Sequence, residues 1–546
     1  MKIRKTIILS VTAIILFSGF ITRDNDIYLE INKSIDIFGR VYKEVALNYV
    51  ETLKPEEFML AGINGMLASL DPYTNFIDEL QQKDIDIITK GKYGGIGASV
   101  GIRNDDITIV ELMEGYSAQR QGMRIGDIIK KINNTPVSRE NADSLSELLK
   151  GDPGSTVKVI VKREGNEDLI IFNLVREEIE VKNVSYYGFV PEQSNNAYIK
   201  LSGFSRSAGE EIKRALLDLK SKKEINSVIL DLRGNPGGLL DAAIDVSEKF
   251  LAKGQSVVSV RGRDSLNVKN YFAQEEPILN DKDMIVLIDE GTASASEIVA
   301  GAIQDHDRGV VVGTNSFGKG LVQTVLPLSY NTSLKITTAR YYTPSGRCIQ
   351  RIDYSDKNKV FEQSSVTKQK EFKTDASRTV LSGGGIMPDS TVKNSSDSYF
   401  VQTLLANGMF FKFATNYFNS NMQKDWKKTD QQILFKEFTG YLKNQKFDFV
   451  SRSENLIAQL ISTGREENVN ENFISQLVKA KSDINANNTL ELEKYRNDVL
   501  GEIKEELSAR TDGREGRIRE SLKFDKQFLT SYEILNNQNL YRRLLR

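Results

Sequence analysis

The sequence predicts a multidomain α/β protein. A layered α/β core is combined with an inserted β-domain, an N-terminal helical segment and a C-terminal α-helical region. The 546 residues exceed what one hydrophobic core usually serves. Short β-rich runs fill the region from Gly91 to about Glu178, and strands alternate with helices from about Asn196 to Asp389. No proline follows Pro388, which favours a helical region at the end of the chain.

Residues 1–26 are typical of an export signal. The basic stretch MKIRK precedes Thr6–Thr22, which carries no charge. This apolar stretch is short for a full span of the bilayer, and no clean cleavage site follows it, so cleavage and retention as an anchor both stay open. In either case we expect the rest of the chain to be exported, in the periplasm or on the outer side of the inner membrane, with membrane contact only through this segment.

Residues 27–88 are predicted to form a helical segment. Apolar residues recur there at alternating steps of four and three, which indicates an amphipathic helix. These residues are Ile31, Ile35, Phe38, Tyr42, Val45 and Tyr49. A second helix is expected after Pro55. Gly62–Ile77 is predicted to be helical up to Asp71-Pro72, because a residue before proline disfavours the helical backbone.

Residues 89–178 are predicted to form the β-domain, residues 179–394 the α/β core, and residues 395–546 the helical region. In the β-domain, Gly115–Val137 offers a short helix, a Gly-Asp turn and a strand. In the last region, apolar residues keep a three-to-four spacing, which we interpret as a face packed in a core. These residues are Leu492, Tyr495, Val499, Ile503 and Leu507.

The composition narrows the chemistry that the chain can perform. A net charge of -1 gives no long-range attraction for nucleic acid, so we expect no nucleic-acid partner. The chain has one histidine, His306, and one cysteine, Cys348. It therefore has no intrachain disulfide and no zinc site of the usual kind, and we expect neither a metal nor a cofactor. His306, beside two aspartates at a helix end, is predicted to be structural, and Cys348 to be a bystander.

A strand-to-helix turn around Ser294 carries the first candidate for catalysis. An apolar strand, Met284–Ile288, runs through Asp289-Glu290-Gly291 into small residues and then a helix. A serine in such a turn exposes its hydroxyl beside the free N–H groups of the helix, such as that of Ala295, which can hold a developing oxyanion. The alternative is that Ser294 or Ser296 only caps the helix. We favour Ser294 as nucleophile and Ser296 as cap.

A lysine between two glycines, Lys319, supplies a second candidate. The stretch from Gly313 to Lys319 nearly matches a phosphate-binding loop, but Gly320 replaces the required serine or threonine and a strand-like run follows. The pattern therefore argues against nucleotide binding. A lysine that loses water in a closed site can have a pKa near neutrality and act as general base for a serine. This chemistry suits a chain with a single histidine.

The glycine-rich loop Asp231–Gly238 follows a strand of valine, isoleucine and leucine and opens a helix. Ligands commonly bind at this edge of a parallel sheet. By itself the loop is equally expected of a tight turn. Beside the Ser294 turn, Gly237 or Gly238 could donate a second N–H group to an oxyanion.

Four stretches together resemble the C-terminal processing, or tail-specific, peptidases. They are GTASASEIVAGAIQD, VVVGTNSFGKGLVQ, DLRGNPGG and SLDPYTNF, and the resemblance covers roughly Ile27 to Asp389. It implies a serine endopeptidase with a serine–lysine dyad that cleaves polypeptides near their C-termini. It also implies that Ser294 is the nucleophile, that Lys319 is the base, and that Gln323 orients the lysine.

The β-domain resembles a PDZ domain. The resemblance places Tyr93, Gly94, Gly95, Ile96 and Gly97 where such domains hold a peptide's terminal carboxylate on backbone N–H groups. The peptide then adds as a strand to the domain's edge. The partners implied are polypeptides with exposed C-terminal tails, and a spacer that binds no tail is the alternative.

Three classes of function compete: a processing protease, an inactive PDZ scaffold, and an α/β acyl-transfer or hydratase-like enzyme. A scaffold would not need serine, lysine and glutamine together, and a coenzyme-binding enzyme would not need a PDZ insert. We therefore favour the protease. The helical region lies outside the motifs, and packing on the core, self-association and binding of an adaptor all stay open for it.

Overall fold

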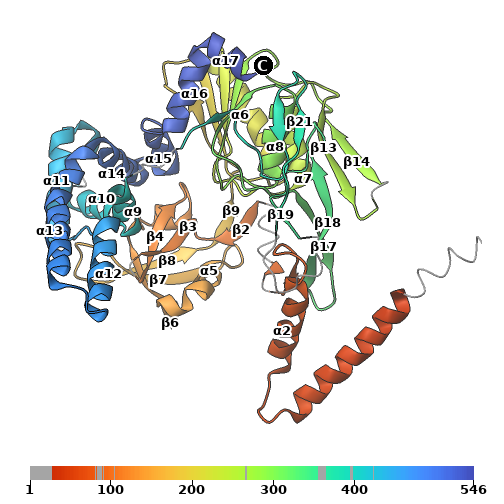
Figure 1. Cartoon of the computed structure of the whole chain (residues 1–546), viewed down its shortest axis with the longest axis horizontal. Helices are drawn as coiled ribbons and strands as arrows, with labels where there is room; N and C mark the ends of the chain where they lie inside the picture. The colour runs from red at the N-terminus through yellow and green to blue at the C-terminus, as the bar shows by residue number, and fades with distance from the viewer. Residues whose placement is uncertain are drawn as a thin grey trace, which may run out of the picture. The chain divides into compact units, whose positions relative to one another are not determined.

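The structure is a computed structural model, and the chain divides into two compact units (Figure 1). One unit contains the described residues up to Glu79 together with Gln323–Thr337, and the other contains the remainder. The residues described are 27–79, 81–82, 89, 91–103, 105–264, 267–354, 365–393, 398–421 and 423–546. The predicted export signal lies outside them. Among the helices that the structure describes, none is both long enough and apolar enough to cross a bilayer.

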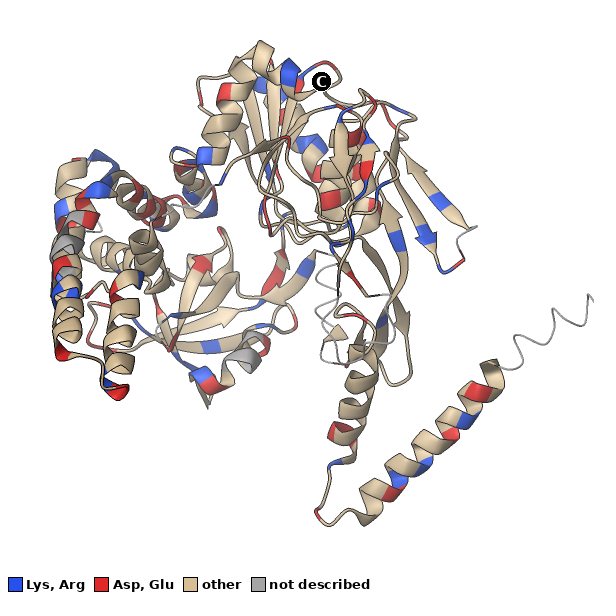
Figure 2. Cartoon of the chain, viewed as in Figure 1, with Lys and Arg blue, Asp and Glu red and all other residues tan. Residues whose placement is uncertain are grey.

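The first unit contains a helix over residues 27–48, helix α2 (Pro55–Ala68) and strand β1 (Asn75–Ile77). The two helices contact each other where the Tyr42 ring stacks on Phe58 at 5.6 Å between centroids. Acidic and basic residues are interspersed along the first helix (Figure 2). Strand β1 pairs antiparallel with the start of β18 (Ser333–Tyr342), and β18 continues into the second unit.

The helix expected to reach Asp71-Pro72 is shorter than predicted. It is the second half of α2 and ends at Ala68, with Ser69 as its C-terminal cap. The Asp71 carboxylate instead accepts hydrogen bonds from the N–H groups of Tyr73 and Thr74, at 2.8 and 2.9 Å. An aspartate that bonds to the backbone just after it favours a turn over a helix.

The fold includes the β-domain that the sequence predicted. Its main sheet has the order β3-β4-β5-β7-β8, with β6 paired to β5 and with β3 at the edge. Its elements are β3 (Ala98–Arg103), β4 (Asp106–Leu112), α4 (Ser117–Arg120), β5 (Ile128–Ile132), β6 (Thr135–Pro136), η1 (Arg139–Asn141), α5 (Ala142–Leu149), β7 (Thr156–Lys162) and β8 (Ile170–Val175). The strand before this sheet in the sequence, β2 (Lys92–Gly95), pairs with the strand after it, β9 (Glu177–Glu180), in a separate two-stranded sheet. The buried Ile109, Ile129, Val159 and Leu174 belong to its core.

The α/β core is built on a six-stranded sheet of order β10-β11-β12-β15-β16-β23, parallel except for the antiparallel pair β10 and β11. Its strands are β10 (Val184–Phe189), β11 (Asn196–Leu201), β12 (Ser227–Asp231), β15 (Asp283–Ile288), β16 (Val310–Gly313) and β23 (Ser390–Thr391). Helices α6 (Ala208–Lys222), α7 (Leu240–Glu248) and α8 (Ala295–Asp305) contribute to the hydrophobic core on one face. Every residue of β12 is buried, as expected for a sheet covered on both faces.

The other face of this sheet is covered by helices from the end of the chain (Figure 1). Phe528 and Ile534 of α16 (Lys526–Asn536) and Tyr541 of α17 (Gln538–Leu544) pack in one cluster with Ile285 and Leu287 of β15. The Met284 N–H group donates to the Tyr541 hydroxyl at 2.9 Å. Of the alternatives left open for the helical region, packing on the core therefore holds for α16 and α17.

The remaining helices have a hydrophobic core of their own, which contains Phe410, Phe438 and Ile503. They are α9 (Tyr399–Ala406), α10 (Met409–Ser420), η2 (Trp426–Lys428), α11 (Gln431–Asn444), α12 (Arg452–Glu466), α13 (Glu471–Lys494) and α14 (Arg496–Thr511), and α15 (Gly513–Ser521) links them to α16. Smaller elements complete the chain: β13 (Ser256–Gly262), β14 (Val268–Phe272), β17 (Leu321–Pro327), β19 (Ile352–Asp353), β20 (Ser365–Val366), β21 (Glu371–Lys373) and β22 (Thr379–Leu381).

Candidate active site

Ser294 occupies the N-cap position of α8, directly after the turn that leaves β15. Its φ of 55° lies in the left-handed region, which residues other than glycine rarely adopt. Backbone strain of this kind concentrates at functional sites. Ser296 is not the helix cap that we expected. It lies inside the first turn, where its buried hydroxyl donates to the Asn235 carbonyl at 3.0 Å.

The carboxylate of Glu297 joins the Ser294 turn to the loop that carries Lys319. One oxygen accepts from the Ser294 N–H at 2.8 Å and from the Lys319 N–H at 2.9 Å. The other accepts from the Ser316 hydroxyl at 2.5 Å and from the Gly318 N–H at 2.7 Å. The side chain is fully buried. Four donors on one carboxylate hold the two segments in a fixed relation.

A second group also contacts both segments. The hydroxyl of Tyr341, at the end of β18, lies between the carbonyl oxygens of Ser294, at 3.2 Å, and of Lys319. The Tyr341 side chain is buried in the core of the α/β domain. The structure thus brings the backbones of Ser294 and Lys319 together through two side chains from different elements, and both residues are half-buried.

Burial raises the pKa of Glu297 to about 7, while the hydrogen bonds from Ser316, Lys319, Gly318 and Ser294 act in the opposite direction. Burial disfavours the charged carboxylate, and donors directed at it favour that form. Perturbed carboxyl groups of this kind cluster at catalytic sites. The sequence patterns did not predict this role for Glu297. A glutamate three residues after an N-cap serine was the available signal.

The glycine-rich loop lies directly against the Ser294 turn. The Ala293 N–H donates to the Asn235 carbonyl at 3.0 Å. A methyl group on Gly237 would lie 2.9 Å from the Ala295 nitrogen, too close for any side chain. The Gly237 N–H, however, donates to the Asn235 side chain at 2.9 Å, so it is directed into its own loop and not toward an oxyanion. Gly238 pairs in a β-bridge with Phe204. Ala295 is the first residue of α8, where N–H groups have no partner within the helix.

Gln323 belongs to the first unit, whereas Ser294 and Lys319 belong to the second. Its side-chain amide donates to the Thr337 hydroxyl at 3.3 Å. Its predicted action on Lys319 therefore stays a prediction.

Sequence reasoning also missed a buried ionic network that joins the start of the glycine-rich loop to α16. The Arg233 guanidinium contacts Asp231 and Asp525, each at 2.6 Å, and donates to Gln527 at 2.9 Å. Burial alone would raise the pKa of Asp231, but the charges of Arg233 and Lys200 hold it well below its usual range. Asp525 and Gln527 belong to the start of α16, which no motif connects with the loop.

The predicted tail-binding residues fall in two places in the β-domain. Tyr93, Gly94 and Gly95 belong to β2 and pair with β9, so part of their backbone bonds to that strand. Ile96 is buried, and Gly97, with φ of 75°, forms the turn into the edge strand β3. A methyl group on Gly97 would lie 2.3 Å from Tyr116, so this turn requires glycine.

His306 and Cys348 have surroundings that suit structural roles. The His306 ring bonds to the Asp375 carboxylate at 2.8 Å and to the Ser256 carbonyl at 2.7 Å. Both of its nitrogens are thereby occupied. Burial raises the pKa of the Cys348 thiol, which disfavours the reactive thiolate.

Comparison with known proteins assigns the family. The model of peptidase family S41 matches residues 195–356. A carboxy-terminal-processing protease of Bartonella bacilliformis is 36% identical over 392 residues, which cover 71% of this chain and 88% of that protein. The chain belongs to the carboxy-terminal processing proteases. A second relative, the carboxy-terminal processing protease CtpB of Bacillus subtilis, is 30% identical over 72% of this chain and 80% of its own length.

Two further family models match other parts of this processing protease. A PDZ model matches residues 94–174, and a model described as the C-terminal helical domain of probable PDZ-proteases matches residues 400–535. The helical region therefore also occurs in other proteins. Among solved structures, the photosystem II D1 C-terminal processing protease is 25% identical over 64% of this chain and 85% of that one, with a TM-score of 0.36. The sequence matches show the family of this chain, and the TM-score adds nothing to them.

Proposed function

We propose that this chain is an exported serine endopeptidase that cleaves polypeptides near their C-termini, with Ser294 as nucleophile and Lys319 as general base. One observation carries the proposal. The buried Glu297 carboxylate binds the backbone of both residues, at 2.8 and 2.9 Å. Burying a carboxylate costs free energy unless it is fully hydrogen-bonded. A buried carboxylate that bonds to both backbones is therefore well suited to hold Ser294 and Lys319 in position for one reaction.

In this proposal the amine of Lys319 acts in its neutral form. It takes the proton from the Ser294 hydroxyl as the oxygen attacks the scissile carbonyl. The same proton then passes to the departing amine, which leaves an acyl-enzyme. A water molecule, deprotonated by Lys319, releases the acyl group and restores the serine.

The N–H group of Ala295 is the main candidate for holding the oxyanion, since it lies at the N-terminus of α8 next to the nucleophile. Gly238 remains the candidate for a second donor. Gln323 is proposed to position the Lys319 amine.

The PDZ domain is proposed to capture the substrate tail before cleavage. The turn at Ile96 and Gly97 would hold the terminal carboxylate, and the tail would add to the edge strand β3. Export is proposed from the basic and apolar pattern of residues 1–26.

The proposal is tested by cleavage of an unfolded polypeptide with an apolar tail. Ser294→Ala and Lys319→Ala should each lower kcat by roughly 10⁴-fold or more, as expected for members of one catalytic unit. Lys269→Ala, at an exposed lysine on β14, serves as the matched control. If Lys319→Ala cleaves as fast as the parent, the dyad is wrong. If an amide in place of the substrate's terminal carboxylate has no effect, capture by the PDZ domain is wrong.

A further inference from the structure

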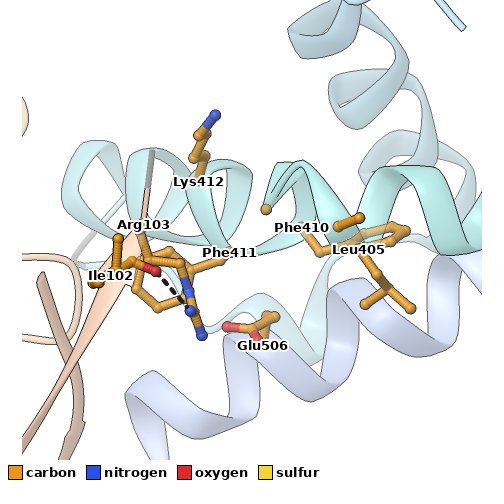
Figure 3. Close-up of a pocket in the computed structure, with 9 residues that line it drawn as sticks. Ile102, Arg103, Leu405, Phe410, Phe411, Lys412 and Glu506 are labelled. Atoms are coloured by element: carbon orange, nitrogen blue, oxygen red, sulfur yellow. Dashed lines mark hydrogen bonds between the residues drawn. The ribbon is translucent and has the colours of Figure 1, made fainter. Parts of the chain in front are cut away.

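A pocket of about 210 Å³ lies where the PDZ domain contacts the helical domain. The PDZ domain contributes Ile102 and Arg103 from the end of β3, and the helical domain contributes Leu405, Phe411 and Glu506 (Figure 3). None of these residues belongs to the candidate active site. The pocket is therefore a separate feature, and its chemistry is not used by the mechanism above.

Direct contacts away from this pocket join the helical domain to the PDZ domain. The Asn419 side chain bonds to the Glu164 carbonyl at 3.2 Å and to Arg124 at 3.4 Å. Gly126 approaches the Thr415 side chain so closely that a methyl group on the glycine would lie 2.4 Å from it. The helical domain thus places its wall at a defined position beside the PDZ sheet.

Strand β3 leads from the predicted carboxylate-binding turn to this pocket. It begins at Ala98, directly after Gly97, and ends at Arg103. One edge of β3 pairs with β4, and among the strands that the structure describes none pairs with its other edge. A peptide added there would advance by about 3.3 Å per residue, and each of its residues would pair with one residue of the strand. If the terminal residue is held at Gly97, the residue about five to six positions upstream lies beside Ile102 and Arg103, at the pocket.

The lining of the pocket favours a large apolar side chain next to an acidic one. Ile102 and Leu405 keep 45% and 47% of their surface exposed, so both present apolar surface that is still uncovered. The Phe411 ring forms the wall beside them, with the Arg103 guanidinium 5.6 Å from its centre. In Figure 3 Arg103 lies along this ring, and Lys412, which also lines the pocket, directs its amine away from the ring.

The charges around the pocket are not balanced. The two oxygens of Glu506 accept from Arg510 and from Arg517, at 2.7 and 2.8 Å, so its charge is already neutralised. Arg103 donates to the Ile102 carbonyl at 3.0 Å, and it forms no ion pair with any residue in the described part of the chain. The guanidinium is thus available to a carboxylate of a bound peptide.

We propose that this pocket is a second recognition site for the substrate tail, which rests on the tail capture proposed above. It accepts a large apolar side chain about five to six residues before the terminal carboxylate, with an acidic residue beside it. The helical domain thereby takes part in choosing substrates, because the PDZ domain alone supplies only one wall of the site.

The test measures binding of labelled peptides to the full-length Ser294→Ala variant, which cannot cleave them by the proposed mechanism. Three peptides of about ten residues share the same apolar last four residues and differ upstream, where they carry Phe-Glu, Phe-Lys or Gly-Ser. Phe-Glu should bind roughly tenfold more tightly than Gly-Ser. It should bind roughly threefold to fivefold more tightly than Phe-Lys, as expected for one rim charge.

Adding Arg103→Glu should reverse the preference between Phe-Glu and Phe-Lys, whereas Lys158→Glu, on the exposed face of β7, should leave it unchanged. A peptide of only the last four residues should bind all three variants equally, which shows that the PDZ domain remains folded. If the three long peptides bind equally but an amide terminus weakens them all, the second site is wrong and tail capture stands. If an amide terminus weakens none of them, tail capture is wrong and the second site falls with it.

Discussion

Replacing Glu297 by glutamine should abolish most of the proteolytic activity. A carboxylate can accept hydrogen bonds at both oxygens, whereas an amide has one accepting oxygen and one NH₂ group that only donates. If the amide oxygen keeps the Ser316 and Gly318 donors, the NH₂ group faces the N–H groups of Ser294 and Lys319, which the carboxylate accepted at 2.8 and 2.9 Å. Two buried N–H groups then lose their acceptor.

Each orphaned donor costs about 1 to 3 kcal/mol, so the variant should lose roughly 2 to 6 kcal/mol of stability. This is a large part of the ~5 to 15 kcal/mol that ordinarily stabilises a domain. The Ser294 turn and the Lys319 loop would also separate, because the donor–donor contacts repel. A displacement of about 1 Å at reacting groups costs roughly 100-fold, so kcat/KM should fall by at least that factor.

The assay is kcat/KM on an unfolded, apolar-tailed polypeptide, with the unfolding midpoint measured alongside. Glu290→Gln, an exposed acid in the same turn, is the matched control and should behave like the parent. Peptide binding to the PDZ domain should be unchanged in both variants, which separates a local defect from global unfolding. The reasoning is refuted if Glu297→Gln keeps kcat/KM within about threefold of the parent.

Three further predictions concern the same region. Burial raises the pKa of Glu297 from 4.5 to about 7, so the folded chain binds this proton more tightly than the unfolded chain. The contribution of this carboxyl group to the free energy of unfolding is therefore complete below pH 4.5 and is lost as the pH rises to about 7. In urea unfolding, the parent should lose roughly 3 kcal/mol of unfolding free energy over this pH interval relative to Glu297→Gln. A difference in unfolding free energy between the two proteins that does not change with pH would contradict this prediction. Gly237→Ala should lower kcat/KM by roughly 100-fold because its methyl group would lie 2.7 Å from the Ala293 oxygen, whereas Gly234→Ala, with φ of 68° but open space, should cost only ~1 kcal/mol of stability. Asp525→Asn keeps the helix cap but removes a buried charge, so it should lower the unfolding free energy by roughly 3 kcal/mol, while equal stability of this variant and the exposed control Asp448→Asn would contradict the role of the ionic network.

The sequence predicted those features that depend on local pattern. Small residues after an apolar strand indicated the turn at Ser294, and alternating strands and helices indicated the α/β core. In each case the signal lies within about ten residues of the feature.

The contacts that assemble the site could not be predicted in this way. Glu297 meets Gly318 only because β15 and β16 are neighbours in the sheet, and Tyr341 arrives from a strand of a different sheet. Periodicity shows that a helix has an apolar face, but it does not show which surface that face covers. One signal was available for the C-terminal helices. The core strands are apolar on both faces, so a second covering layer was required from somewhere in the chain.

The covering of the core sheet by α16 and α17 has a consequence for how the molecule is made. The strands that these helices cover are synthesised long before residues 526–544, so one apolar face of the sheet stays exposed while most of the chain is produced. The sheet that carries the Ser294 turn reaches its final packing only when the last helices arrive.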